Sequence, residues 1–148
     1  MVAKRQEAVR EYLAAGGIVL HPDGGRILVL IRPSRDEVRL PKGHVELHEA
    51  PETAAQREVA EESGYDDLII LQPLGEQLVA FTDAQGKPVQ RIELYYLMQA
   101  RSLHEYTRPL EDVLQFYSIW LTWDEALEHL TYEAEREWVR RARKAYGA

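Results

Sequence analysis

The feature that most constrains this chain is a 23-residue stretch, residues 43–65, in which glycines and charged residues stand at fixed spacings. Its second half predicts one helix. Pro51 suits the first helical turn, where its missing N–H costs nothing, and Gly64 suits the left-handed residue just past a helix end. We therefore expect a helix over residues 51–63. The whole stretch reads GHVELHEAPETAAQREVAEESGY.

Three glutamates of this predicted helix, Glu58, Glu61 and Glu62, stand at positions i, i+3 and i+4. Their carboxylates can therefore converge on one side of the helix. Arg57 precedes Glu61 by four residues and can orient it, and Glu49 can add a fourth carboxylate from the preceding loop. Like charges at this spacing weaken a helix by about 0.2–0.5 kcal/mol per pair, a cost that a bound cation would remove. A solvated acidic face is the alternative.

The predicted cation is Mg²⁺, with Mn²⁺ as a possible substitute. Carboxylate oxygens without His or Cys partners select hard cations, and Mg²⁺ shares its shell between one or two carboxylates, water and substrate phosphates. Gly43 lacks a Cβ, so its backbone can turn sharply or approach a phosphate closely. We therefore assign Glu58, Glu61, Glu62 and Gly43 to a metal-phosphate site.

The pattern of Gly43, five residues, Glu49, seven residues and Arg57 through Gly64 resembles the Nudix box, and the chain resembles the Nudix hydrolase superfamily. Seven fixed residue types coincide by chance on the order of once in 10⁸ windows. The resemblance implies an α/β (α+β) fold, an α/β/α sandwich with a mixed central sheet. It also implies attack of water on a phosphoanhydride bond, with Glu58 as the first choice of base.

Non-catalytic nucleotide binding is the alternative function, because some Nudix-fold domains act as regulators without cleaving their ligands. Such domains typically have degraded boxes. This chain retains every charged position of the box, and the one departure is Tyr65 in place of the usual aliphatic residue. The complete box favours catalysis.

Composition predicts a single domain over residues 1–148, because 45% of the residues are apolar and one core of this size can be stable alone. The net charge of -7 disfavours extended binding to nucleic acid or to an anionic membrane. The absence of cysteine excludes disulfides and thiolate metal sites. Charges throughout residues 1–11 and the lack of a long apolar run lead us to expect a cytoplasmic protein; a homodimer stays open.

The rest of the chain alternates strand patterns with helix patterns. Strands are expected over residues 12–20, 26–32, 67–81, 89–98 and 115–121. The first two form a hairpin, and the third, as one or two strands, bends or bulges near Pro73 and Gly75. The strand over 89–98 is apolar on both faces, which predicts helices on both sides of the sheet.

Two helices are expected at the C-terminal end. Thr122 and Glu125 form a capping box for a short helix through Leu130, and Thr131 caps a last helix. That last helix carries an apolar stripe that we expect in the core, and a charged pair on another face. The stripe is Tyr132, Val139, Ala142 and Tyr146, and the pair is Glu137 and Arg141.

Substrate contacts are expected from both sides of Gly43. Lys42 can reach a phosphate as a point charge, with an exposed lysine as the alternative, and His44 is either a phosphate donor or structural. The string Pro-Lys-Gly-His resembles the start of the box in Nudix enzymes that act on diadenosine polyphosphates and diphosphoinositol polyphosphates. Among the arginines we favour Arg91 or Arg32 as a bidentate phosphate clamp.

Glu93 shares a strand face with Arg91 and needs a partner there. Related Nudix enzymes often supply an additional glutamate from outside the box, so Glu93 is the candidate for that ligand or for a second-choice base. A simple Arg-Glu surface pair is the alternative, and Glu111 is the reserve candidate.

Phe81 follows Gly64 by seventeen residues, where diadenosine polyphosphate hydrolases resemble one another in carrying a tyrosine that stacks a base. Phenylalanine keeps the ring face on which a base can stack. A core position is the alternative for Phe81, and Tyr95 and Tyr96 are the alternative residues for the stacking role. Diadenosine polyphosphate is therefore the leading substrate. The alternative substrates are RNA 5′-triphosphate ends, diphosphoinositol polyphosphates, mutagenic dNTPs and ADP-ribose. The lack of a proline at the corresponding spacing weakens the resemblance to ADP-ribose pyrophosphatases.

Overall fold

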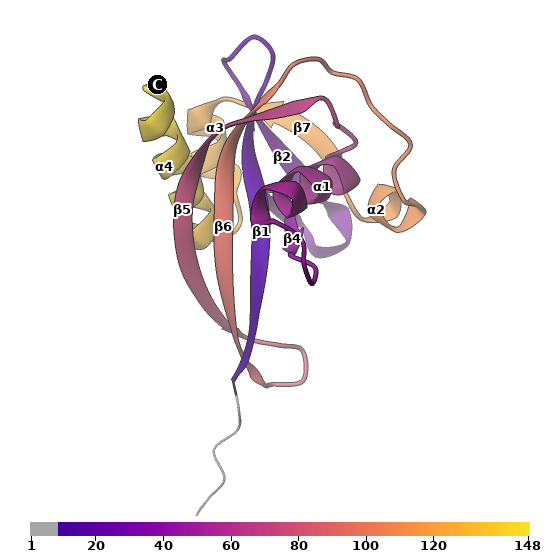
Figure 1. The fold of residues 1–148 in the computed structure, drawn as a ribbon, viewed down its shortest axis with the longest axis vertical. Coiled ribbons are helices and arrows are strands. Elements are labelled where there is room, and N and C mark those ends of the chain that lie inside the picture. Colours follow the sequence, from indigo (N-terminus) through magenta and orange to yellow (C-terminus); the bar gives the residue numbers. More distant parts are fainter. Residues whose placement is uncertain (1–8) are drawn as a thin grey trace, which may run out of the picture.

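A seven-stranded mixed sheet organises the computed structural model, which describes residues 9–148 (Figure 1). The order is β3-β2-β1-β6-β5, with β4 paired to β1 and β7 paired to β2. The neighbours β1 and β6 run parallel, whereas β5 and β6 run antiparallel. The strands are β1 (Arg10–Leu20), β2 (Ile27–Arg32), β3 (Glu37–Arg39), β4 (Lys42–His44), β5 (Leu68–Thr82), β6 (Pro88–Ala100) and β7 (Tyr117–Leu121).

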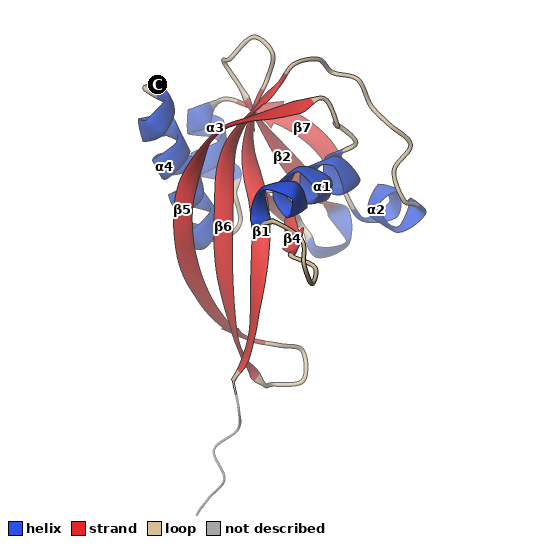
Figure 2. Ribbon diagram, in the orientation of Figure 1, coloured by secondary structure: helices blue, strands red, loops and turns tan. Residues whose placement is uncertain are grey.

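Helices cover both faces of this sheet (Figure 2). On one face Ala54, Ala55 and Val59 of α1 enter a buried apolar cluster with Val19 and Met98 of the strands. On the other face a second cluster joins the sheet to α3 and α4. The α/β/α sandwich is therefore confirmed. The helices are η1 (Pro33–Arg35), α1 (Pro51–Ser63), α2 (Leu110–Gln115), α3 (Trp123–His129) and α4 (Glu133–Tyr146).

Local sequence signals predicted several of these elements correctly. Helix α1 covers residues 51–63, and Gly64 ends it with a φ of 90° in the left-handed region. Register shifts in β5 between Ile70 and Gln72, and again between Pro73 and Gly75, confirm the predicted irregularity within one continuous strand. The β1–β2 hairpin and the capping box of α3 are also confirmed.

At the C-terminal end of the chain, Thr131, Tyr132 and Tyr146 do not have the roles that the sequence predicted. Thr131 does not cap α4, because its Oγ1 accepts a hydrogen bond from the Val38 amide at 2.8 Å and α4 begins at Glu133. Tyr132 and Tyr146 are exposed, so they are not part of the core. Glu135 and Trp138 are buried in their place. Val139 and Ala142 are buried as expected, and Glu137 pairs with Arg141 at 3.7 Å.

The strand expected over residues 115–121 begins only at Tyr117, because residues 110–115 form the short helix α2. No helix within residues 9–148 is long and apolar enough to cross a membrane. Residues 1–8, part of the charged start on which the expected location rests, lie outside the described residues.

Candidate active site

The site begins where the C-terminal half of α1 meets β4. The carboxyl group of Glu58 lies against the backbone of Gly43, so closely that a Cβ atom at residue 43 would overlap it. One turn further along the helix, Glu62 accepts a hydrogen bond from the Lys42 amide at 2.8 Å. Two consecutive residues of β4 thus contact two glutamates of α1, which holds the glutamate-bearing face of the helix against this strand.

Arg57 organises the carboxylates around it. Its guanidinium donates to Glu49 from Nε at 2.8 Å and from Nη2 at 2.9 Å, and to Glu58 from Nη1 at 2.8 Å. A further bond to the His44 carbonyl at 3.0 Å ties α1 to the end of β4. Glu61 is more distant from Nη1, at 3.3 Å. Arg57 therefore orients Glu49 and Glu58 more closely than Glu61, the partner predicted from spacing.

Burial and hydrogen bonding shift the pKa values of the box carboxyl groups in opposite directions. The hydrogen bonds from Arg57 lower the pKa of Glu49 to about 2. Burial raises the pKa of Glu58, and it raises the pKa of Glu62 to about 8 despite the bond from the Lys42 amide. Burial also lowers the pKa of the Lys42 amine. A nearby cation would favour the ionised form of both raised carboxyl groups.

The donor set fits a hard divalent cation in the chemical kind of its ligand atoms. Glu58, Glu61 and Glu62 supply only carboxylate oxygens from one region of α1, the ligand type that Mg²⁺ prefers. As they stand within residues 9–148, no three acidic or histidine side chains converge enough to hold a metal ion. Arg57 and the Lys42 amide occupy oxygens of Glu58 and Glu62 instead. A cation would therefore require side chains to turn from these partners.

A cavity of about 320 Å³ opens beside the box carboxylates. It brings together residues predicted for substrate binding with three of the four predicted for the metal, whereas the fourth, Glu61, does not line it. The His44 ring packs edge-on against Tyr12 with ring centroids 4.2 Å apart, which fixes its position. The predicted site residues among its lining are Lys42, Gly43, His44, Glu58, Glu62 and Arg91.

A larger cavity, about 580 Å³, lies next to it and shares Arg91 as a wall. Phe81 and Tyr132 line this second cavity with 37% and 45% of their surfaces exposed, so the core alternative for Phe81 is wrong. The Arg91 guanidinium lies 5.1 Å from the Phe81 ring centroid, and the Arg39 guanidinium lies 4.8 Å from that of Tyr132. Aromatic surface and cationic groups are thus combined in one cavity.

Glu93 lies outside both cavities and is fully buried. One oxygen accepts from Arg91 Nε at 2.7 Å and the other from the indole Nε1 of Trp138 at 2.8 Å. The partner that the strand pattern demanded is therefore Arg91, joined by a tryptophan 45 residues further along the chain. Because Glu93 is buried, the alternative of a surface pair is wrong. Both carboxylate oxygens of Glu93 already accept hydrogen bonds.

The other predicted residues take different places. Arg32 lines neither cavity, and its guanidinium lies 5.7 Å from the Phe116 ring. Tyr95 is fully buried and stacks on Trp138 with ring centroids 4.6 Å apart, and Tyr96 is buried in the core on the α1 side. The two tyrosines are therefore unavailable as stacking surfaces, and Arg32 is not part of the wall of either cavity.

Asp112 is the acidic residue that the sequence pattern did not single out. Burial and then the charge of Glu61 raise the pKa of Asp112, which places this side chain of α2 near the box. Arg108 holds the preceding loop against the end of α1 by donating to the Glu62 carbonyl at 2.9 Å. The reserve candidate Glu111 is exposed. No signal in the sequence distinguished these two neighbouring acids, because the loop packing decides which one faces α1.

The family model of the NUDIX domain matches residues 11–142 of this chain. The chain belongs to the Nudix hydrolase family. Nudix hydrolases act on nucleotide small molecules and generally use divalent metal ions, in agreement with the carboxylate-lined cavity.

Individual relatives of this Nudix domain differ in what they act on. An 8-oxo-(d)GTP phosphatase of Mycolicibacterium smegmatis is 30% identical over 126 residues, which are 85% of this chain but only 36% of that protein. The chain thus spans about a third of that relative's length. A C. elegans Ap4A hydrolase in a binary complex has a TM-score of 0.68 at 21% identity, covering 92% of this chain and 98% of the other.

A second similar structure is the E. coli dihydroneopterin triphosphate pyrophosphohydrolase. Its TM-score is 0.65 at 20% identity, and the match covers 91% of this chain and 97% of the other. At this level of identity the likeness of both solved structures establishes the Nudix fold and leaves the substrate open.

Proposed function

We propose that this Nudix domain hydrolyses a phosphoanhydride bond of a nucleoside di- or polyphosphate with the aid of Mg²⁺, and that its leading substrate is a diadenosine polyphosphate. The observation that carries the proposal is the pair of adjoining cavities that share Arg91. One contains the box carboxylates, and the other contains two partly exposed aromatic rings. A phosphate chain with a base at its end has the matching chemistry.

In the proposed reaction, a water oxygen attacks phosphorus and the bond from phosphorus to the bridging oxygen breaks. The bridging oxygen leaves with the electron pair on the departing phosphate. Glu58 accepts the proton of the attacking water, because its carboxyl group lies in the smaller cavity beside Gly43. When bound, a divalent cation held by Glu58, Glu61 and Glu62 would neutralise phosphate charge and lower the pKa of a bound water.

The remaining site residues bind and orient. Lys42 and Arg91 supply cationic groups to the phosphates, and Arg57 fixes the Glu58 carboxylate through its Nη1 bond at 2.8 Å. Glu93 is better suited to support Arg91 than to act as base, since both its oxygens already accept hydrogen bonds. Phe81 offers a ring face to a base in the larger cavity. His44 and the Gly43 backbone border the phosphates.

A modified nucleoside triphosphate is the second candidate substrate, because the relative at 30% identity is an 8-oxo-(d)GTP phosphatase. The two candidates differ in length. A diadenosine polyphosphate carries a second nucleoside that must extend beyond the two cavities, whereas a triphosphate needs only one nucleoside site. A cytoplasmic location and a homodimer stay predictions from the sequence.

The test is a panel of substrates incubated with the purified protein, with products separated by chromatography. The panel contains diadenosine tetraphosphate, 8-oxo-dGTP, a diphosphoinositol polyphosphate, ADP-ribose and a 5′-triphosphate RNA. Each is tested with Mg²⁺, with Mn²⁺ and with a chelator. We expect metal-dependent cleavage, fastest with diadenosine tetraphosphate. Preference for 8-oxo-dGTP would replace the leading substrate, and no cleavage of any compound would contradict the hydrolase proposal.

A further inference from the structure

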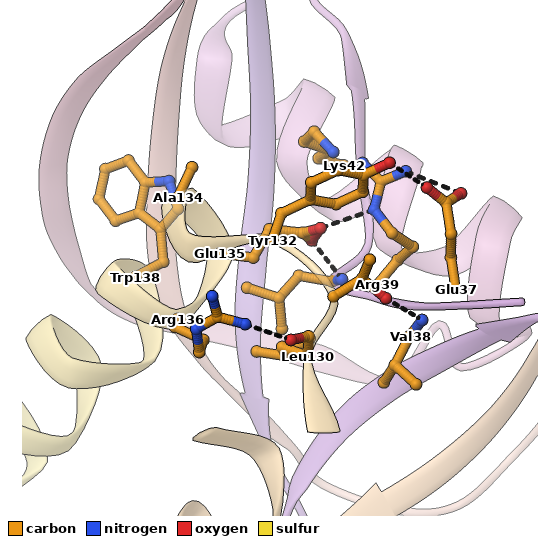
Figure 3. A network of polar contacts seen from close by, with 12 residues as sticks. Glu37, Val38, Arg39, Lys42, Leu130, Tyr132, Ala134, Glu135, Arg136 and Trp138 are labelled. Atoms are coloured by element: carbon orange, nitrogen blue, oxygen red, sulfur yellow. Dashed lines mark hydrogen bonds and ion pairs between the residues drawn. The ribbon is translucent and has the colours of Figure 1, made fainter. Parts of the chain in front are cut away.

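The segment that leads into the box, residues 39–43, is held by glutamates from two helices. Glu135 of α4 accepts from the Leu40 amide at 2.5 Å with Oε2 and from Arg39 Nε at 2.6 Å with Oε1 (Figure 3). Glu62 of α1 accepts from the Lys42 amide at 2.8 Å. The segment therefore lies between two fixed carboxylates, one from each helical layer of the sandwich.

Glu135 is in a position to fix the segment firmly. It is only 2% exposed, and a buried carboxylate is stable only when its oxygens are paired. Both oxygens are paired to the lead-in segment itself. Glu135 also raises the pKa of Arg39 although burial opposes the charge, so the ion pair keeps the guanidinium ionised. Losing Arg39 would leave the buried Glu135 carboxylate without its ion-pair partner, whereas Arg39 has a second carboxylate, Glu37, at 3.5 Å.

Helix α4, which carries Glu135, is itself anchored to the sheet close to this point. Trp138, one turn further along, stacks on Tyr95 of β6 at 4.6 Å and donates to Glu93. Just before the helix, Thr131 exchanges hydrogen bonds with the backbone of Val38 in β3, at 2.8 and 3.1 Å. Glu135 therefore projects from a rigid support and not from a mobile helix end.

We infer that Glu135 is a positioning residue for the active site. By fixing the Leu40 amide it places the next residues of the segment, so that the Lys42 amide meets Glu62 and Gly43 meets the Glu58 carboxyl. Glu135 also lines the larger cavity, so one side chain connects the wall of the proposed nucleoside site with the segment that contacts the catalytic helix. The effect of Glu135 on turnover rests on the proposed function, whereas its effect on the position of residues 39–43 does not.

The test replaces the carboxylate by an amide in Glu135→Gln. The amide keeps one acceptor oxygen but places an NH₂ group opposite one of the two donors, the Leu40 amide or Arg39 Nε. The hydrogen bonding to residues 39–40 therefore weakens. We expect hydrogen exchange at the Lys42 amide to accelerate by roughly tenfold, the equivalent of one weakened hydrogen bond, although its own acceptor Glu62 is unchanged. We also expect kcat to fall by about 10²-fold, the cost of a misplacement near 1 Å, with KM nearly constant.

The matched control is Glu137→Gln, which makes the same chemical change on the same helix. Glu137 is exposed at 42% of its side chain and, among residues 9–148, pairs only with Arg140 and Arg141. Exchange at Lys42 and the kinetic constants should stay at their wild-type values in this variant. Exchange is measured by NMR on the metal-free protein, and thermal melting is recorded for every variant.

Glu135→Gln with faster exchange at Leu40 alone, and with unchanged Lys42 exchange and kcat, would overturn the inference and reduce Glu135 to a local contact. If Glu135→Gln does not fold, Glu135→Asp decides, because it keeps the charge but withdraws the carboxylate by one methylene. The same acceleration at Lys42 is then expected, and wild-type exchange there would overturn the inference. If no nucleotide is cleaved by the wild type, the proposed function fails while the exchange measurement still decides the role of Glu135.

Discussion

The carboxyl group of Glu58 lies against the backbone of Gly43 so closely that no side chain can be placed between them. Gly43 is in strand β4 and is not among the residues with positive φ. A sharp turn is therefore not the reason for glycine at this position. The reason is that the Glu58 carboxylate approaches the backbone of the strand closely. This contact places the proposed base beside the phosphate cavity.

Gly43→Ala should displace the Glu58 carboxyl group and lower kcat by about 10²-fold, the cost expected for misplacing a reacting group by about 1 Å. Gly25→Ala is the control, because its new Cβ would meet only Asp23 Oδ1 at an ordinary 3.6 Å. Steady-state kinetics and thermal melting of both variants check the prediction. Wild-type kcat in Gly43→Ala would show that Glu58 need not occupy its present position.

The base assignment predicts different outcomes for two glutamates. Glu58→Gln should lower kcat by about 10²–10⁴-fold, the usual contribution of a general base, and Glu93→Gln should lower it much less. Glu93→Gln should instead raise KM, because Arg91 loses the carboxylate that orients it at 2.7 Å. Both are measured at saturating Mg²⁺, since Glu58 is also a proposed metal ligand. A larger loss of kcat in Glu93→Gln would move the base out of the box.

Glu61→Gln tests the metal assignment, because Arg57 holds Glu61 less closely than Glu49 and Glu58. The amide keeps the size of the side chain and removes a negative charge. We expect the Mg²⁺ concentration for half-maximal activity to rise while the melting temperature stays nearly constant. An unchanged Mg²⁺ titration would remove Glu61 from the proposed ligand set.

Phe81→Ala should weaken binding of substrates that carry a base. Stacking of a base on an aromatic ring contributes about 1–3 kcal/mol, so KM for diadenosine tetraphosphate should rise by roughly tenfold or more. Turnover of a diphosphoinositol polyphosphate should change little. Leu78→Ala in the same strand is the control, since Leu78 is 60% exposed and lines neither cavity. Equal losses on both substrates in Phe81→Ala would argue against stacking.

The raised pKa of Glu62, about 8 against an ordinary 4.5, predicts a pH dependence of stability in the metal-free protein. Between these two values the folded state keeps a proton that the unfolded state releases, so the stability from this group falls as pH rises. The slope is at most about 1.4 kcal/mol per pH unit. Urea unfolding from pH 5 to 8 with a chelator should show this decline, and Glu62→Gln should flatten it. Identical slopes in the two proteins would contradict the assignment.

Much of the fold near the box was predictable because its signals are local. Proline at the first helical turn and glycine past the last one act through their own φ angles, so the limits of α1 followed from Pro51 and Gly64. The irregularity of β5 near Pro73 and Gly75 has the same local origin. The spacing of Glu58, Glu61 and Glu62 placed three carboxylates on one helix before any tertiary contact was known.

Partners that are distant in the chain were not predictable in this way. Thr131 has the residue type of a helix cap, yet its hydroxyl bonds to Val38, 93 residues away. Glu93 needed a partner, but Trp138 was not foreseeable as its second donor. Asp112 rather than Glu111 approaches the box because the loop before α2 is held against α1.

The sequence by itself determined the family, the box helix and the kind of ligand atoms, because these depend on residue type and on spacing within a few turns of chain. The tertiary structure decided which side chains meet. Packing of α4 on the sheet buried Glu135 against Leu40, and packing of α1 on β4 brought Glu58 to Gly43. Such contacts follow from how whole layers of the sandwich fit together, and no local pattern in the chain encodes them.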